Sequence, residues 1–277
     1  MSQAIAENHK VVSQKEWLEA RKAFLAKEKN LTHQRDALNA ERLKLPWVKV
    51  EKNHVFDGPN GKVSLGDVFG GRSQLIVYHF MFGPGWKEGC PSCSMLGDGI
   101  DAAVTHLANR DVTLVAISRA PFSDIQAFQQ RMNWRFKWFS SFGNDFNFDY
   151  HVSFTKEETA KKEMYYNYTL QHFPSEEGPG ASVFYKDATG SIFHTYSTFG
   201  RGLEGGLVPY NYLDIAPKGR NEENLPHPMA WVRHHDRYQD NYYDAAPAGG
   251  PTAAAASAAS AGRMKSAGSC CEGEHHT

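Results

Sequence analysis

The chain has 277 residues, enough for one large domain or two small ones with a sizeable core. Its formal net charge is −1 and its isoelectric point is about 6.9, so the overall charge favours neither nucleic acid nor an anionic membrane as a partner. The N-terminal residues lack a secretory signal pattern, and the longest apolar run, LIVYHFMF, is too short to span a bilayer. We therefore expect a cytoplasmic protein.

Residues 1–45 are expected to form a helical arm. Ser13 and Glu16 have the spacing of a capping box at a helix start. Four apolar residues then recur at helical spacing: Trp17, Leu18, Phe24 and Leu25. A second helix is predicted over residues 32–43, because Pro46 ends the pattern. The arm would pack outside the main domain or on a partner chain, which leaves a homodimer open.

Residues 46–244 show the alternation of strands and helices that indicates an α/β domain with a mixed sheet. A buried central strand is predicted at QLIVYHFMF (74–82), because it is almost continuously apolar. The remaining predicted elements are short strands at 47–50 and 54–56, an Asn-Gly hairpin turn, a helix to about residue 109, a strand at 112–118, a helix at 121–132 and a hairpin at 181–197.

Cys90 and Cys93 form a C-x-x-C pair between the central strand and the predicted helix that follows. In a reducing compartment such a pair is more often catalytic or metal-binding than part of a disulfide scaffold. A structural zinc site would need a second pair at fixed spacing within the fold, whereas the other two cysteines are adjacent and near the C-terminus. Glycines and charged residues around the pair predict an exposed turn rather than buried, inert thiols.

Residues 245–277 are expected to be a disordered tail. Up to residue 269 the composition is dominated by Ala, Gly, Ser and Pro, which cannot bury enough surface to offset ordering entropy. The tail then carries Cys270 and Cys271, followed by His275 and His276. Three interpretations stay open: a dispensable tail, a tethered dithiol that recharges the first pair, or a site that captures soft metals.

Several segments together resemble a bacterial family of unknown function whose members are described as predicted dithiol–disulfide oxidoreductases with a thioredoxin-like fold. The resemblance covers about residues 11–243. It rests on LIVYHFMFGPGWKEGCPSCS, AISRAPFSDIQAFQQRMNWRFKWFSS, SVFYKDATGSIFHTYSTFGRG, YNYLDIAPKGR and WVRHHDRY. It implies a thioredoxin-like mixed sheet flanked by helices, and a redox-active dithiol.

The resemblance also implies roles for the residues around the dithiol. A helix start offers unpaired amides and a partial positive charge, which favour a thiolate. Cys90 would be the nucleophile, and Cys93, one turn further, would resolve the mixed disulfide. Lys87 would add to the stabilisation of the thiolate. Trp86 and Pro91 would support the motif, since proline suits an early helical position.

The sequence departs from the related families at several positions. Gly89 stands where thioredoxins have tryptophan, and Pro179 is displaced from the position of their cis-proline. Peroxiredoxins have a threonine where this chain has Lys87, and Arg119 is the candidate replacement for their distant arginine. Dithiol exchange is therefore preferred over peroxide reduction.

The remaining candidate residues are aromatic or histidine. His234 and His235 are interpreted as part of a solvated turn, with a general base for the cysteines as the alternative. His79, inside the apolar strand, is expected to be a hydrogen-bonded core residue. The aromatic segment 133–154 is predicted to lie in the core and to form a pocket wall beside the cysteines.

These observations predict a thiol–disulfide oxidoreductase that requires no metal or organic cofactor. Its partners would be a disulfide-bearing protein or a small-molecule thiol substrate, and an external thiol reductant. One alternative is a peroxiredoxin-like peroxidase, in which Cys90 meets the peroxide and Cys93 condenses with the sulfenic acid. The other is a non-catalytic protein whose tail binds soft metals.

Overall fold

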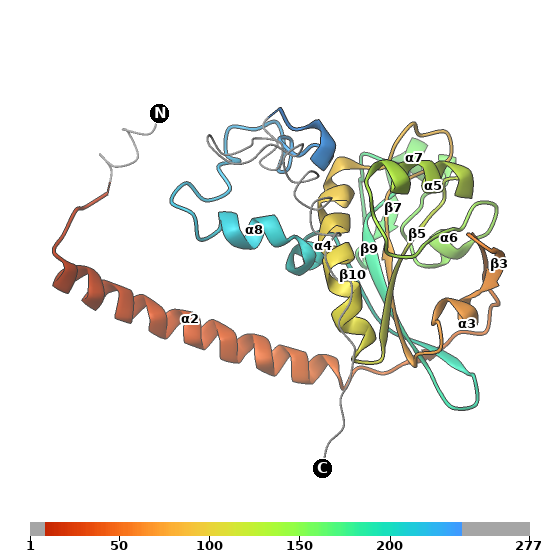
Figure 1. Cartoon of the computed structure of the whole chain (residues 1–277), viewed down its shortest axis with the longest axis horizontal. Helices are drawn as coiled ribbons and strands as arrows, with labels where there is room; N and C mark the ends of the chain where they lie inside the picture. The colour runs from red at the N-terminus through yellow and green to blue at the C-terminus, as the bar shows by residue number, and fades with distance from the viewer. Residues whose placement is uncertain (1–8, 240–277) are drawn as a thin grey trace, which may run out of the picture. The chain divides into compact units, whose positions relative to one another are not determined.

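An eight-stranded mixed sheet forms the centre of the fold (Figure 1). The structure is a computed structural model that describes residues 9–239. The strand order is β1-β10-β9-β4-β5-β6-β2-β3, with β4, β5 and β6 parallel and every other neighbouring pair antiparallel. The strands are β1 (Val48–Lys49), β2 (Val55–Gly58), β3 (Gly61–Ser64), β4 (Gln74–His79), β5 (Val112–Ser118), β6 (Trp138–Ser140), β9 (Gly180–Lys186) and β10 (Ile192–Phe199).

Helices connect the parallel strands, as expected for strand–helix–strand units. The connection from β4 to β5 contains α4 (Pro91–Ala108), and that from β5 to β6 contains α5 (Phe122–Arg131). The remaining helices of the fold are α3 (Leu65–Val68), α6 (Phe146–Asp149), α7 (Lys156–Lys161), η1 (Gly200–Gly206) and α8 (Val208–Leu213). This arrangement is thioredoxin-like, which confirms the predicted fold class.

The central strand β4 is buried on both faces, as its apolar run predicts. Leu75 and Val77 pack in one core cluster, together with residues of α3 and α6. Tyr78 belongs to the cluster on the opposite face, which includes residues of α4 and α5. Because successive strand residues point to opposite faces, this one strand joins both halves of the core.

The N-terminal arm is a single helix rather than two, so the prediction of a separate second helix is wrong. Helix α2 (Gln14–Arg42) is continuous (Figure 1) and begins at the predicted capping box of Ser13 and Glu16. No glycine or proline interrupts it, and the Thr32 hydroxyl donates to the Glu28 carbonyl within the helix instead of starting a new one. None of its residues is buried.

The predicted hairpins are present. Strands β2 and β3 pair around the Asn-Gly turn, where Gly61 has a φ of 99°. Strands β9 and β10 pair with Lys186 opposite Ile192. The aromatic segment contributes a strand that the sequence did not predict, β6, and a separate two-stranded sheet is formed by β7 (Met164–Tyr166) and β8 (Thr169–Gln171).

The contacts divide the chain into two units, residues 1–234 and 235–277, and only the first contains the sheet. The second contributes the short helix η2 (His235–Arg237). The predicted tail lies outside the described residues, and the predicted boundaries at residues 45 and 244 stay predictions. Within residues 9–239, no helix is both long and apolar enough to cross a membrane.

Candidate functional site

Cys90 lies at the point where the chain enters α4. It is the N-cap residue, with an extended backbone (φ −59°, ψ 131°), and Pro91 is the first residue of the helix. The Cys90 amide donates to the Met81 carbonyl at 3.0 Å, which fixes the cysteine beside the end of the central strand. Its carbonyl accepts from the Ser94 amide at 2.9 Å and so begins the helical hydrogen bonding. Sequence and structure agree on this placement.

The two thiols differ in exposure. Cys93 is 2% exposed, and Cys90 is half-buried; both are free thiols. The prediction of an exposed turn is therefore wrong for Cys93. The reason is the aromatic packing around the motif, because Cys93 belongs to the same core cluster as Trp134 and Trp138. The aromatic segment thus packs in the core that contains Cys93.

The hydrogen bonding around Cys90 favours its thiolate. The pKa of Cys90 is lowered to about 7, chiefly by a hydrogen bond from the Cys93 thiol, and burial opposes this shift. The Cys90 side chain makes no formal capping hydrogen bond, but the amides of Ser92 and Cys93 lie close enough to its sulfur to lower the pKa further. Burial raises the pKa of Cys93, and its hydrogen bond to Cys90 raises it too. The half-buried sulfur is therefore the better nucleophile.

Tyr78 is a site residue that the sequence reasoning missed. It lies on β4, is 3% exposed, and its hydroxyl hydrogen-bonds the Cys93 sulfur. Burial, followed by the proximity of Cys93, raises the pKa of Tyr78, so the phenol keeps its proton and can donate it to a thiolate. In sequence this tyrosine is simply one member of an apolar strand.

Gly89, the residue before Cys90, is enclosed by two aromatic rings. A Cβ atom at this position would lie 2.6 Å from the Phe80 ring and 2.9 Å from the Phe128 ring. Only glycine fits this gap without a shift of the core, which explains why tryptophan is absent here.

His234 packs against this loop and not against a cysteine. Its Nε2 donates to the Gly89 carbonyl at 2.9 Å, and its Nδ1 accepts from Arg131 Nη2 at 3.1 Å. A carbonyl only accepts and a guanidinium only donates, so these partners assign the neutral tautomer with the proton on Nε2. The ring is 2% exposed, so the predicted solvated turn is wrong for this residue. Both of its nitrogens are engaged, and the alternative role as a general base is not supported.

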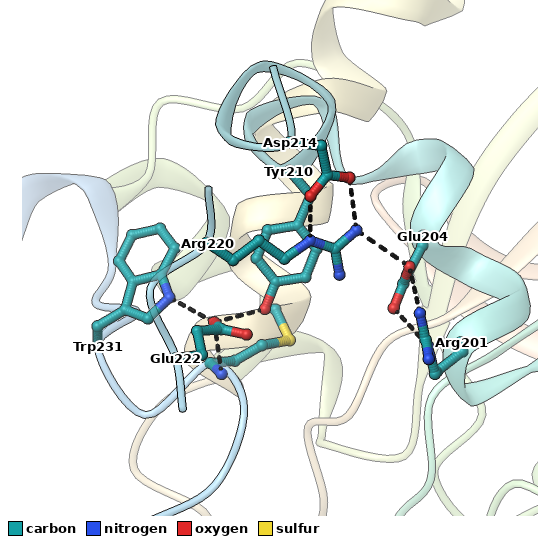
Figure 2. Close-up of polar contacts among 8 residues, drawn as sticks. Arg201, Glu204, Tyr210, Asp214, Arg220, Glu222 and Trp231 are labelled. Atoms are coloured by element: carbon teal, nitrogen blue, oxygen red, sulfur yellow. Dashed lines mark hydrogen bonds and ion pairs between the residues drawn. The ribbon is translucent and has the colours of Figure 1, made fainter. Parts of the chain in front are cut away.

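Figure 2 shows the contacts that anchor the segment leading to His234. The Oε1 atom of Glu222 accepts three hydrogen bonds. They come from the Tyr210 hydroxyl at 2.8 Å, the Met229 amide at 2.9 Å and the Trp231 indole at 2.6 Å. Tyr210 is buried in the core cluster that also contains Cys93. Glu222 therefore ties the chain just before His234 to the core around the dithiol.

Figure 2 also shows the ion pairs that Arg220 makes near Glu222. Arg220 donates to both carboxylate oxygens of Asp214, at 2.6 and 2.8 Å, and to Glu204 at 3.3 Å. Its guanidinium also lies 3.9 Å from the centre of the Tyr210 ring. These contacts stabilise the turn between α8 and Glu222.

Arg119 is held by an acidic residue that the sequence did not single out. Its Nη1 donates to Glu177 at 2.8 Å, and its guanidinium lies 4.5 Å from the centre of the Phe148 ring. Glu177 is 1% exposed, and burial raises its pKa to about 7, although a hydrogen bond from Ser153 and the charge of Arg119 oppose that shift. The guanidinium of Arg119 is therefore engaged by Glu177 and by the Phe148 ring.

Trp86, predicted to support the motif, and Lys87, predicted to stabilise the Cys90 thiolate, lie in the loop that leads to Cys90. The Trp86 indole donates to Glu176 at 3.0 Å and so ties the loop to the segment before β9. Lys87 is exposed and, together with Trp86 and Arg131, lines a cavity of about 390 Å³. The carbonyl of Pro179 accepts from the Tyr166 hydroxyl at 2.6 Å, and its peptide bond is trans, as are all others in the described part of the chain.

Two further predictions concern histidine and metal ligands. His79 is 1% exposed, and its Nε2 hydrogen-bonds the Ser182 hydroxyl at 2.8 Å, as expected of a core residue. Between residues 9 and 239 no group of three histidine, cysteine or acidic side chains could hold a metal ion. The cysteines and histidines of the tail, and with them the relay and soft-metal interpretations, lie outside the described residues.

The strand order and the free C-x-x-C pair at the start of α4 define a thioredoxin-like α/β protein with a dithiol next to its central strand. The chain belongs to the bacterial family of unknown function DUF899, whose sequence profile matches residues 6–238. This confirms the family resemblance. No curated protein matches the sequence.

Similar solved structures have low sequence identity to the chain. Xylella fastidiosa PrxQ is 11% identical with a TM-score of 0.38; the match covers 60% of this chain and 94% of that one. Peroxidoxin BcpB from Mycobacterium tuberculosis is 11% identical with a TM-score of 0.36, covering 59% and 94%. A protein from Chlorobium tepidum described as the thiol:disulfide interchange protein DsbE is 14% identical with a TM-score of 0.37, covering 60% and 97%.

Proposed function

We propose that the protein is a thiol–disulfide oxidoreductase that uses Cys90 and Cys93. The observation that carries the proposal is the arrangement of the two cysteines. Cys90 is half-buried at the start of a helix, and its pKa is lowered to about 7. The cause is chiefly a hydrogen bond from Cys93, which is buried one helical turn further along the chain. At neutral pH this arrangement provides a thiolate nucleophile and a protonated second thiol. Dithiol exchange needs these two species.

The proposed reaction begins when the Cys90 thiolate attacks one sulfur of a substrate disulfide. The substrate S–S bond breaks, one substrate thiolate leaves, and a mixed disulfide forms at Cys90. Cys93 then loses its proton and attacks the Cys90 sulfur, which releases the second substrate thiolate and leaves a Cys90–Cys93 disulfide. The dithiol has then given two electrons to the substrate.

The coupling between the two cysteines supports this order of events. The negative charge of Cys90 is one cause of the raised pKa of Cys93. Once Cys90 is bound in a mixed disulfide that charge is gone, so Cys93 becomes easier to ionise. The Tyr78 hydroxyl, which already hydrogen-bonds Cys93, would stabilise the resulting thiolate.

The proposal includes the partners and the compartment. The substrate is a disulfide-bearing protein or small molecule, and an external thiol reduces the Cys90–Cys93 disulfide after each turnover. A reducing cytoplasm would keep the pair in the free form. Cys270 and Cys271 are proposed as an auxiliary dithiol that passes electrons to the first pair.

Reduction of insulin disulfides by dithiothreitol tests the proposal on the full chain. The wild-type protein should accelerate the reaction, Cys90→Ser should not, and Cys93→Ser should accumulate a mixed disulfide without further turnover. Equal rates for wild type and Cys90→Ser would overturn the proposal. The double variant Cys270→Ser with Cys271→Ser tests the auxiliary pair alone, because it leaves Cys90 and Cys93 intact.

The same variants distinguish this activity from peroxide reduction. A peroxidase would convert Cys90 to a sulfenic acid when peroxide is added and would turn over rapidly. We expect slow oxidation of Cys90 by peroxide and fast exchange with disulfides. The reverse order of rates would replace dithiol exchange with the peroxidase alternative.

A further inference from the structure

Helix α2 presents apolar side chains that no part of the described chain buries. Trp17, Phe24, Leu31 and Leu38 are 51–67% exposed, and none of the 29 residues of the helix is buried. A helix usually places its large apolar residues against a core. A row of such residues left in solvent marks an interaction surface.

These four residues recur at intervals of seven, so they lie on one stripe along the helix. A coiled coil repeats apolar residues at two seam positions of each heptad, and over four heptads this helix supplies one of the two. The other seam position, four residues further on, is charged in each heptad: Arg21, Glu28, Arg35 and Arg42. The seam therefore alternates between apolar and charged side chains.

We propose that α2 of a second copy of this chain covers the stripe in an antiparallel orientation. In a parallel pair each charged position would face its own copy, so that arginine would lie opposite arginine and Glu28 opposite Glu28. Like charges in a seam are destabilising. In an antiparallel pair each charged position faces an apolar one, and the charges do not meet.

One register fits the whole stripe. It sets Trp17 opposite Arg42 and Phe24 opposite Arg35 of the other copy, so that the Phe24 ring faces the guanidinium of Arg35. The guanidinium of Arg42 already lies 5.0 Å from the centre of the Tyr196 ring in its own chain. It also places Leu31 opposite Glu28, whose carboxylate is already paired with Arg21 of its own helix at 2.7 Å. A shift of one heptad would set Trp17 opposite residue 49, beyond the end of α2, in one direction, and Leu38 opposite Gln14, the first residue of the helix, in the other. The paired segment would be roughly 39 Å long at 1.5 Å per residue.

The mass of the full chain in solution tests the proposal at micromolar concentration. One chain has a mass of 31.0 kDa, and sedimentation equilibrium should give twice this value. Leu31→Glu adds a charge in the middle of the stripe and should weaken the dimer at least roughly tenfold. The matched control is Ala26→Glu, which adds the same charge to an exposed position of the same helix but away from the stripe, and should leave the mass unchanged. A wild-type monomer, or equal effects of the two variants, would overturn the proposal.

Disulfide cross-linking tests the orientation. All four native cysteines are first changed to serine, and Arg21→Cys and Leu38→Cys are then introduced into separate chains. In the proposed register these two positions face each other, so the mixture should form mixed disulfide dimers. The Leu38→Cys chain alone should not cross-link. Cross-linking of that chain with itself would show a parallel pair and would overturn the antiparallel arrangement.

Discussion

The imidazole of His234 donates a hydrogen bond to the carbonyl oxygen of Gly89 across 145 positions of sequence. Gly89 immediately precedes the proposed nucleophile, and Glu222 anchors the chain just before His234. Two hydrogen bonds therefore hold the loop that presents Cys90. One joins the Cys90 amide to the Met81 carbonyl just after β4, and the other comes from His234, the last residue of the first unit. We propose from this contact that His234 positions the Cys90 loop and does not act as a base.

The first prediction concerns this contact. His234→Leu removes the donor to Gly89 and leaves a buried carbonyl without a partner, which costs about 1–3 kcal/mol of unfolding free energy. Because the Cys90 loop loses its support, disulfide reduction should slow by roughly tenfold. His234→Gln keeps a donor and should restore part of the rate. An exposed histidine of the same segment provides the control, since His227→Leu should change neither quantity. If the control variant loses as much stability and rate as His234→Leu, the positioning role of His234 is wrong.

The second prediction concerns the space around Gly89. Gly89→Ala would force a methyl group against Phe80 and Phe128, and overpacking of this kind costs about 1–3 kcal/mol. Gly205→Ala is the control, because no atom lies within 4 Å of the added Cβ. Urea denaturation measures both. Equal stability of the two variants would show that the loop can move away from the rings at little cost.

The third prediction separates the two chemical steps. Tyr78→Phe removes the hydrogen bond to Cys93, which is worth about 0.5–1.5 kcal/mol, so release of the second substrate thiol should slow by roughly two- to tenfold. The alkylation rate of Cys90 should change little. Single-turnover kinetics measure the release. Tyr150→Phe, at a half-buried tyrosine of the other core cluster, should leave the release unchanged, and an equal slowing in that variant would argue against a specific role for Tyr78.

The fourth prediction is a pH dependence of stability. The pKa of Glu177 is raised to about 7 by burial, from 4.5 in the unfolded chain. Between these values the folded protein holds a proton that the unfolded chain has lost, so stability falls as pH rises. The free energy of unfolding of the wild type, relative to Glu177→Gln, should fall by up to about 3 kcal/mol between pH 4.5 and 7. Urea denaturation across this range checks it. If the difference in unfolding free energy between wild type and Glu177→Gln stays constant or rises with pH, Arg119 keeps the Glu177 carboxylate ionised.

Local patterns in the sequence predict much of the fold. The run at 74–82, the strand at 112–118 and the hairpin at 181–197 are each recognisable from a few neighbouring residues, because burial and turn geometry leave a local signature. The position of Cys90 follows from the same patterns, since a helix directly follows a buried strand.

The features that the sequence did not predict depend on distant contacts. Burial of Cys93 requires the aromatic side chains of residues 134–138 to pack on α4, and no local pattern shows this. The pairing of Arg119 with Glu177 joins segments 58 positions apart. Strand β6 has three residues, too few for a clear period. The continuity of α2 could have been recognised, because the sequence between the two predicted helices contains no glycine or proline.

The pKa of the Cys90 thiol is the most direct test of the proposed chemistry. It can be measured in the full chain as the pH dependence of iodoacetamide alkylation, with the Cys90 peptide quantified by mass spectrometry. The hydrogen bonds from Cys93 and the helix amides predict half-maximal reactivity near pH 7, and Cys93→Ala should raise this value. A pKa of about 8.5, that of an ordinary thiol, would contradict the proposed role of Cys90 as an activated nucleophile.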